Sequence, residues 1–531
     1  MNFGMIRYTL GWLMIFEAGF LTVPLITSLC YITSPLEWWS LISIIIGMLI
    51  CSGLGTLCVL KKPKSRELYA KDGLVVVAMS WIVLSLLGAI PLFIDGLMYT
   101  RDENVVEWFI DCFFEISSGF TTTGSSILKA VEDLPKSMIM WRSFTHWVGG
   151  MGVLVFIMAF LPLGGAQNLH IMRAESPGPT VSKLVPKMKK TAFILYLIYF
   201  ILTVVMFITL LFDNGANCEN GKMTVFEAIN TSFATAGTGG FGLKNDSLAG
   251  FSDYAQIIVT IFMIIFSVNF SSYYLVFKRR FKDAFNLEVK IFFLIVIIAI
   301  LAITLNIYFT DFTGEKLAEL ASVQASDIKI SVNENGEAIG EYSFGSALKH
   351  AAFNVATIIS TSGFGTENFV AWPEMSQIIL VLLMFIGACA GSTGGGIKVS
   401  RILILFKGVL RELKGAIHPR QVNKITIDKR PVADETVRSV NAYIACYIIV
   451  FVVIMILISF DPFVTDLTTA FTSTAATINN IGPGLGTVGP TSNFSGYNWF
   501  STLVLSFSMI AGRLELIPIL ILFSPKTWKK N

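Results

Sequence analysis

The chain has 531 residues, of which 54% are hydrophobic and only 14% are charged, with a formal net charge of +3. This composition excludes an ordinary soluble globular domain, in which about a quarter of the residues are charged. It indicates a protein whose helices lie in lipid. The four histidines and seven scattered cysteines show no spacing typical of a metal site, a catalytic triad or a disulfide framework, which disfavours an enzyme.

Apolar runs of membrane-spanning length recur along the chain. A helix needs roughly 20 apolar residues to cross a bilayer core, and runs of about this length predict about ten spans. In chain order they are Thr9–Ile32, Trp38–Leu60, Leu74–Ile94, Ile139–Leu163, Thr191–Phe212, Ile257–Phe277, Ile291–Phe309, Ile378–Cys389 with its continuation Ile397–Val409, Tyr443–Phe460 and Trp499–Phe523. The first run is too long for a cleavable signal peptide, so we expect it to be a span.

A short Ser/Thr-rich element followed by a glycine recurs four times between these spans. The copies are Phe114–Leu128, Ala228–Asn245, Phe353–Asn368 and Phe471–Gly486. Because a repeat fixes the architecture, we predict an all-α polytopic membrane protein with two N-terminal helices and four pseudo-fourfold helix–pore loop–helix repeats. The predicted units are residues 1–70 for the N-terminal pair and 71–172, 173–284, 285–415 and 416–531 for the four repeats.

Lysine and arginine gather in one set of loops, and acidic residues gather in the other. The basic loops are residues 61–71, 173–190, 278–282, 411–430 and 526–530. The positive-inside rule therefore predicts cytoplasmic termini and repeats that enter the membrane from the outer face. Asp311–Ser346 is predicted to be an outer insertion with a turn at residues 333–336. Leu413–Glu435 is either an inner docking surface for a partner or a solvated basic loop.

Each glycine segment is too short to span and must enter and return on the same side. Irregular backbone at membrane depth is tolerated only where protein or a water-filled cavity satisfies it. Four such segments around one axis would direct carbonyl oxygens to the centre, which is how a cation's hydration shell is replaced in potassium filters. The alternative is that the glycines are helix breaks or close-packing points, which are common in membrane helices.

Several motifs together resemble the Trk/Ktr/HKT potassium transporter superfamily. They are SSGFTTTGS, ATAGTGGFG, STSGFG and NNIGPGLG, with GSTGGGIK in the third repeat, AGRLE in the last helix and RAESPGPT after the first repeat. The two extra N-terminal spans make the chain similar to the TrkH-type membrane subunits of that superfamily. The chain departs from the commonest wording at Ala236-Gly237, where a Val-Ser pair is usual.

The resemblance implies an ion-binding filter and a gate. The implied filter residues are Thr122, Thr123, Gly124, Thr238, Gly239, Gly240, Thr361, Ser362, Gly363, Asn480, Ile481 and Gly482. The implied gate residues are Gly391, Gly394, Gly395, Gly396, Lys398 and Arg513, within or below an intramembrane loop at residues 387–396. A phosphate-binding loop is disfavoured there because no Gly-Lys-Ser/Thr ending follows the glycines.

For several charged residues the sequence allows both a functional and a structural role. An arginine in the middle of a span, such as Arg513, marks an ion path by default, but an ion pair with Glu515 or another buried acid is the alternative. Lys398 and Arg401 either anchor the loop or reach the inner surface. Glu115 either attracts cations to the outer mouth or anchors the first pore helix, and His146 is interpreted as a packing residue.

By resemblance, the chain moves K⁺ inward across the cytoplasmic (inner) membrane, needs no cofactor of its own and binds no nucleic acid. A homodimer and a cytosolic TrkA-type regulatory subunit that binds NAD and ATP are the implied partners. Proton symport is not required, because 100 mV contributes about 2.3 kcal/mol per charge. The alternatives are a sodium or mixed Na/K transporter on the same scaffold, and a secondary transporter with broken helices, which predicts inverted or twofold repeats.

Overall fold

The structure is a computed structural model that describes residues 1–65, 69–97, 104–152, 188–215, 221–324, 327–332, 336–421, 423–428 and 430–528. The predicted span from Ile139 beyond Gly152, the RAESPGPT motif and the turn residues 333–335 lie wholly or partly outside these ranges. The described chain is predominantly helical, as predicted, and its few strands are short.

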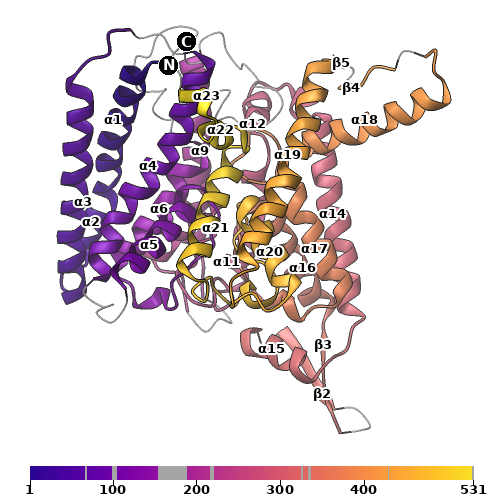
Figure 1. The fold of residues 1–531 in the computed structure, drawn as a ribbon. Coiled ribbons are helices and arrows are strands. Elements are labelled where there is room, and N and C mark those ends of the chain that lie inside the picture. Colours follow the sequence, from indigo (N-terminus) through magenta and orange to yellow (C-terminus); the bar gives the residue numbers. More distant parts are fainter. Residues whose placement is uncertain are drawn as a thin grey trace.

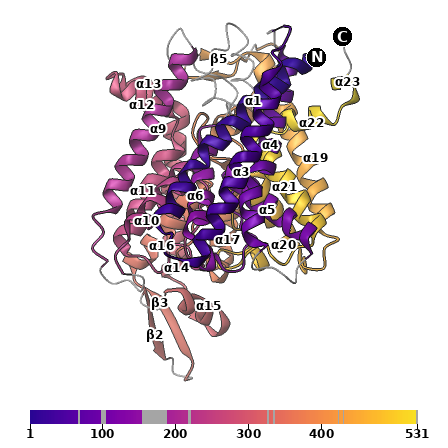
Figure 2. The same ribbon diagram turned by 90° about the vertical axis from the view of Figure 1, so that its left-hand side faces the viewer.

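The N-terminal helices form a separate layer at one side of the molecule. They are α1 (Phe3–Phe20), α2 (Thr22–Cys30) and α3 (Pro35–Leu60), and Figures 1 and 2 show them beside α4. Small residues let α1 and α3 approach closely, since a Cβ on Gly55 would lie 2.8 Å from the carbonyl oxygen of Gly11. The outer face of α3 exposes Leu49 and Leu57, as expected for a helix that faces lipid.

Four groups of helices follow, and each has the same order of elements. A long helix comes first: α4 (Ala70–Gly96), α9 (Met188–Leu210), α14 (Leu287–Tyr308) or α19 (Asp434–Ile458). A short helix of 12 to 16 residues comes next: α5 (Val105–Phe120), α10 (Val225–Gly237), α16 (Phe344–Ile359) or α20 (Leu467–Ile478). A third helix completes each group: α6 (Lys136–Gly150), α11 (Asp253–Ser267), α17 (Glu374–Ile386) or α21 (Trp499–Arg513).

In the described part of the chain, three of the third helices are broken, and only the break at the glycine loop after α17 was predicted. Among the described residues, six helices are long and apolar enough to cross a membrane, or seven if one bent pair counts as a span. That pair, α11 and α12 (Phe270–Phe277), bends by 90°. The break falls at Asn269, whose side-chain oxygen accepts a 2.8 Å hydrogen bond from the Ser271 N–H and so starts a new helix.

The other two breaks have different causes. α17 stops at Gly387, which has φ +63°, and α18 (Val399–Ile417) begins only after the predicted glycine loop. α21 stops at Arg513 because Glu515 and Leu516 have φ of +57° and +67°, and α22 (Ile517–Leu522) follows. The glycine loop was predicted as a break, whereas the Glu515–Leu516 turn was not.

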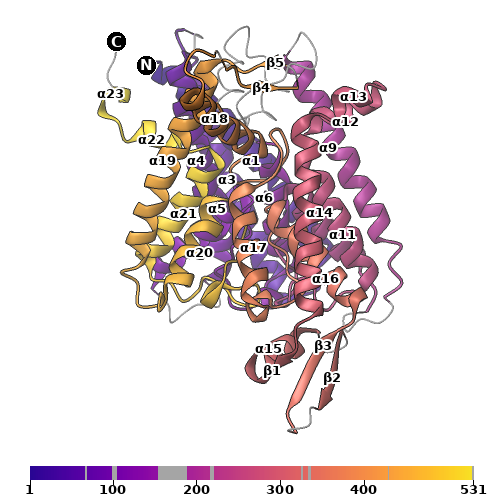
Figure 3. The same cartoon turned by 90° about the vertical axis from the view of Figure 1, so that its right-hand side faces the viewer.

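The predicted insertion is a small folded unit at the end of the molecule opposite both termini (Figure 1). It contains β1 (Phe312–Thr313), α15 (Gly314–Gln324), β2 (Ile328–Val332) and β3 (Ala338–Tyr342). The strands form an antiparallel sheet in the order β1-β3-β2, with Ile330 paired to Gly340. At the other end, β4 (Thr426–Ile427) pairs with β5 (Arg430–Pro431) near α18 (Figure 3).

Candidate functional site

The four short helices carry their C-terminal ends into the centre of the protein. Each begins with a side-chain cap, from Asn104, Thr224, Ser343 or Asp466. The last turns are wholly buried, at residues 112–120, 234–237, 353–359 and 472–478. Because a helix C-terminus carries partial negative charge, four such ends favour a cation at the place where they converge.

Each short helix ends in the same backbone motif. The first case shows it: the Thr122 N–H donates to the Gly119 carbonyl (3.1 Å), and the Thr123 N–H donates to the Ser118 carbonyl (2.9 Å). This pair of bonds defines a Schellman motif, whose C′ residue is left-handed. The C′ residues are Thr122, Thr238, Thr361 and Asn480, with φ of +56°, +55°, +58° and +55°.

The segments after these helices form a closed ring. A Cβ on Gly124 would overlap the Gly239 carbonyl oxygen, and one on Gly240 would overlap that of Ser362. A Cβ on Gly363 would likewise overlap the Ile481 carbonyl oxygen. The ring closes because a Cβ on Gly482 would lie 3.0 Å from the carbonyl oxygen of Thr123.

The ring therefore runs through the four repeats in chain order, and it brings the predicted filter segments together. The four glycines have positive φ, +84°, +68°, +81° and +109° for Gly124, Gly240, Gly363 and Gly482. Both the dihedral angles and the close carbonyls exclude a larger residue at these positions. The polar atoms nearest the glycines are main-chain carbonyl oxygens, which are the ligands that coordinate K⁺ in potassium filters.

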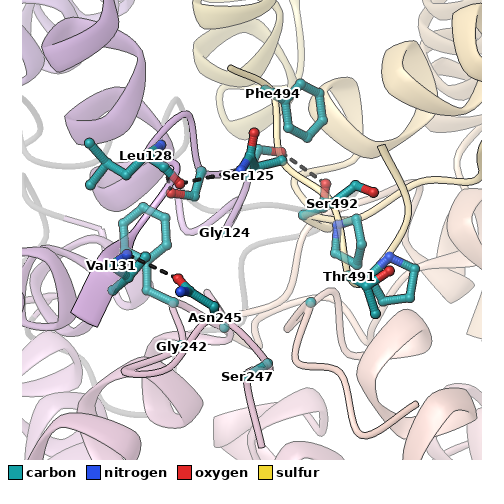
Figure 4. Close-up of a pocket in the computed structure, with 18 of the residues that line it drawn as sticks. Gly124, Ser125, Leu128, Val131, Gly242, Asn245, Ser247, Thr491, Ser492 and Phe494 are labelled. Atoms are coloured by element: carbon teal, nitrogen blue, oxygen red, sulfur yellow. Dashed lines mark hydrogen bonds between the residues drawn. The ribbon is translucent and has the colours of Figure 1, made fainter. Parts of the chain in front are cut away.

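A cavity of about 140 Å³ lies on the side of this ring that is formed by the residues following the four glycines. All four glycines line it, and Figure 4 shows Gly124 and Ser125 at its wall. Loops of neighbouring repeats are joined around it, as where the Val131 N–H donates to the Asn245 side chain (3.0 Å, Figure 4). Within the described ranges, no group of three or more His, Cys, Asp or Glu side chains could hold a metal ion.

A buried ion pair supports the first filter segment. The Glu115 carboxylate lies 2.6 Å from Arg142, and it accepts a 2.9 Å hydrogen bond from the Ile127 N–H, just after the filter. Arg142 also lies 4.2 Å from the centre of the Phe241 ring, which belongs to the second filter segment. Glu115 is fully buried, so its geometry favours the anchoring interpretation over cation attraction.

His146 lies behind the same segments and contacts the first pore helix. Its Nδ1 is 2.8 Å from the Gly119 carbonyl oxygen, which can only accept, so this nitrogen donates. Its ring also lies against the Phe241 ring, with centroids 4.2 Å apart. The predicted packing role fits these contacts.

The third predicted filter segment is connected by hydrogen bonds to the insertion at residues 311–346. Glu367 accepts hydrogen bonds from Trp372 (3.2 Å) and from the Tyr342 hydroxyl of β3. His350 Nε2 lies 2.8 Å from Asp327. Burial alone would raise the pKa of Asp327, but hydrogen bonds from His350 and Lys349 and the Lys349 charge outweigh it and lower the pKa to about 2.

The glycine loop between α17 and α18 lies directly against the filter ends. The Gly395 N–H donates a 2.6 Å hydrogen bond to the Thr361 hydroxyl, and a Cβ on Gly394 would lie 2.9 Å from the Ser360 carbonyl oxygen. The buried Lys398 ammonium donates to the carbonyls of Gly394 and Gly395. Lys398 therefore anchors the loop, one of its two predicted roles.

Arg513 reaches across the interior below the ring. Its guanidinium donates to the carbonyls of Thr393 (2.8 Å), Gly149 (2.6 Å) and Gly150 (2.8 Å). The Thr393 carbonyl belongs to the third repeat, and those of Gly149 and Gly150 belong to the first. The Arg513 side chain therefore connects the fourth repeat with the first and the third. Glu515, the alternative partner considered for Arg513, forms an ion pair with Arg401.

Two supports of the site were missed by sequence reasoning. The strained left-handed residues were assigned to the glycines alone, although a Thr or Asn stands two places before every filter glycine. This constant spacing of two residues was the signal in the sequence that could have identified the left-handed positions. The Arg142 partner of Glu115 lies 27 residues away on another helix, and no local pattern pairs the two.

Comparison with known proteins supports the resemblance of the motifs. The family described as TrkH, cation transport protein, matches residues 41–530. The chain belongs to the TrkH family of cation transport proteins. It is 31% identical over 538 residues to the Trk system potassium uptake protein TrkH of Escherichia coli K12, covering all of both chains. It is 33% identical over 472 residues to the protein of that name in Salmonella typhimurium, covering 87% of each.

The fold of a solved TrkH-family structure also matches throughout. The crystal structure of the potassium transporter TrkH from Vibrio parahaemolyticus superposes with a TM-score of 0.79 at 29% identity, and all of both chains are covered. The chain is therefore a polytopic membrane protein of a transport family rather than of an enzyme family. Its breaks, loops and short helices can be interpreted within that fold.

Proposed function

We propose that this protein takes up K⁺ through the ring formed by its four glycine segments. The observation that carries the proposal is the closure of the ring in chain order, with carbonyl oxygens against each glycine. A dehydrated cation at the centre would exchange water oxygens for main-chain oxygens. The TrkH relatives named above are potassium uptake proteins, which supports the same ion here.

K⁺ is preferred over Na⁺ because all four filter positions are glycine. A serine at the first such position goes with sodium transport in some members of the superfamily, and this chain has Gly124 there. We assign the filter to the twelve residues that precede and include the four glycines, at 122–124, 238–240, 361–363 and 480–482. Sodium or mixed transport on the same scaffold is the alternative outcome.

The gate is the glycine loop at residues 387–396 together with Arg513. The loop contacts the inner ends of α16 and α20, and Arg513 adds a positive charge below the ring. A charge there repels a cation that leaves the filter. Flux therefore requires that the loop and Arg513 move aside.

The protein lies in the cytoplasmic membrane with both termini inside, as the distribution of basic loops indicates. We infer a homodimer and a cytosolic TrkA-type subunit that binds NAD and ATP and docks on the basic inner loop of residues 413–435. The membrane potential supplies the driving force, since 100 mV is worth about 2.3 kcal/mol per charge. Because the membrane potential alone can drive K⁺ uptake, coupling to proton entry is not required.

Rubidium and sodium uptake in bacteria that lack their own K⁺ uptake systems tests the proposal. We expect the chain to restore growth at low K⁺ and to accumulate Rb⁺ in preference to Na⁺. Restoration of Na⁺ uptake without Rb⁺ uptake would support the sodium alternative. Absence of uptake of either ion, with the protein present in the membrane, would contradict cation uptake altogether.

A further inference from the structure

An ion pair lies on the inner side of the gate and joins two helices that carry gate residues. Arg401 belongs to the first turn of α18, three residues after Lys398, and Glu515 lies two residues after Arg513. Only 7% of the Arg401 side chain and 24% of the Glu515 side chain are exposed. The pair thus connects the segment that holds the loop with the segment that positions Arg513.

One further contact and a local backbone turn fix the geometry of this pair, and a cavity lies beside it. The Arg401 guanidinium lies 4.0 Å from the centre of the Tyr443 ring of α19. Glu515 occupies a left-handed turn with φ +57°, which ends α21. A cavity of about 300 Å³ adjoins Arg401, Tyr443 and Glu515 on the inner side. This cavity leaves room for the two side chains to separate.

We propose that Arg401 and Glu515 are positioning residues that hold the glycine loop and Arg513 in the arrangement seen below the filter. The inference rests on the proposed function and adds a regulatory contact to it. Lys398, the N-cap residue immediately before α18, holds the carbonyls of Gly394 and Gly395. Because the Arg401 N–H donates to the Lys398 carbonyl in the first turn that follows this cap, the ion pair makes the loop and the end of α21 move together.

Electrostatics gives the direction of the effect. Lys398 lies close enough to interact with Arg401, Arg513 and Glu515, and Arg401 is paired with Glu515. Glu515 is therefore the acid that faces these three cations, while Glu288, which also interacts with Lys398, contacts the N–H groups of Ala390 and Ser400. Without Arg401, the carboxylate of Glu515 attracts Arg513 away from its carbonyl partners. Without Glu515, the three cations repel one another at low dielectric constant. Either change weakens the closed arrangement and raises the basal flux.

The test is basal rubidium uptake by the full chain in proteoliposomes, normalised to incorporated protein, with the Rb⁺/Na⁺ ratio measured in parallel. We expect Arg401→Gln and Glu515→Gln each to raise basal uptake by roughly fivefold or more, the lower end of typical coupling between sites. The double variant should exceed neither single variant, because the two residues act as one unit. The Rb⁺/Na⁺ ratio should stay unchanged, since the filter is intact.

Arg411→Gln is the matched control. Arg411 lies on the same helix α18 and also forms ion pairs, with Glu412 and Asp434, but at the exposed inner surface. It should leave uptake unchanged. Glu515→Asp keeps the charge and shortens the side chain by one methylene, so it is expected to raise uptake to a smaller extent even if the glutamine variants fail to assemble.

Two results would overturn the inference. The first is a basal uptake equal to that of the wild type both in Glu515→Asp and in whichever glutamine variant assembles. The other is additive effects, or effects of opposite sign, in the two glutamine variants. Failure of the wild-type chain to take up Rb⁺ would instead contradict the proposed function, so the two failures are distinguishable.

Discussion

Three threonines and an asparagine hold a backbone conformation that glycine would adopt at lower cost. A β-branched residue in the left-handed region costs on the order of 1–3 kcal/mol, yet Thr122, Thr238 and Thr361 all have φ near +56°. Two of these side chains make hydrogen bonds to other segments that glycine could not make. Thr361 accepts from the Gly395 N–H, and Asn480 donates to the Thr123 hydroxyl at 2.9 Å.

The hydroxyl of Thr361 is therefore expected to hold the gate loop against the filter. Thr361→Gly relieves the backbone strain but leaves the Gly395 N–H without its acceptor, a loss of about 1 kcal/mol. We expect about a fivefold rise in basal rubidium uptake in proteoliposomes. Thr361→Ser keeps the hydroxyl and is the control. Equal uptake by the glycine and serine variants would show that the hydrogen bond does not hold the loop.

Substitution of a filter glycine should erode selectivity rather than stability alone. In Gly363→Ser the new Cβ would overlap the Ile481 carbonyl oxygen, so this oxygen must leave the ring. The φ of +81° at this position also disfavours a residue with a side chain. We expect the Rb⁺/Na⁺ uptake ratio to fall. Gly345→Ser in α16, the short helix that precedes Gly363, is the matched control, because a Cβ there meets no atom closer than 3.8 Å. A ratio that changes equally in both variants would contradict the assigned filter position.

Removal of the charge below the ring should raise the flux. Arg513→Ala deletes the cation and its three carbonyl contacts, and we expect basal uptake to rise. Arg513→Lys retains the charge and should stay near wild type. Lower or unaltered uptake in the alanine variant would indicate that Arg513 is a purely structural residue.

At the scale of elements, the sequence predicted the positions of helices better than their continuity. The pore helices were predictable because four copies of one pattern stand in register, and the loop after Ile386 was predictable because its glycines break a helix visibly. The break at Asn269 lies inside an apolar run, where a single cap residue gives no distinct signal. The Glu515–Leu516 turn gives no signal either, because its left-handed residues are a glutamate and a leucine rather than glycine or asparagine.

The outer insertion is expected to detach from α16 at low pH. The pKa of Asp327 is lowered from 3.8 to about 2, so its contribution is fully present above about pH 4 and is lost as the pH falls toward 2. The lowered pKa corresponds to a contribution of about 2 kcal/mol to the stability of the folded insertion. Hydrogen exchange of the β2 and β3 amides, corrected for intrinsic rates, should show this loss of protection.

Asp327→Asn provides the control for that experiment. It removes the charge but keeps the side-chain volume, so protection should be lower at neutral pH and should no longer depend on pH in this range. A wild-type protein whose strands stay fully protected down to pH 2 would contradict the role assigned to Asp327.

At the scale of the whole molecule, the two ends differ in structure and charge. Both termini, α18 and the β4–β5 hairpin lie at one end, and the folded insertion lies at the other (Figures 1 and 3). Between them, long helices expose large apolar side chains, such as Leu197, Leu301 and Ile449. A belt of this kind belongs in lipid, so the molecule must place one end on each side of the membrane.

The orientation determines which way the filter faces, and it can be measured directly. Among the described residues, the basic segment 278–282 after α12 and the basic helix α18 lie at the end that carries the termini (Figure 3), so we expect that end in the cytoplasm. A green fluorescent protein fused after the last residue should fluoresce, because it folds in the cytoplasm. An epitope inserted beside Gly336, where a Cβ would meet no atom within 4 Å, should be reached by antibody in spheroplasts without permeabilisation. Fluorescence lost at the C-terminus together with an epitope reached only after permeabilisation would reverse the orientation. The 140 Å³ cavity would then face the cytoplasm, and the gate loop and Arg513 would lie on the outer side.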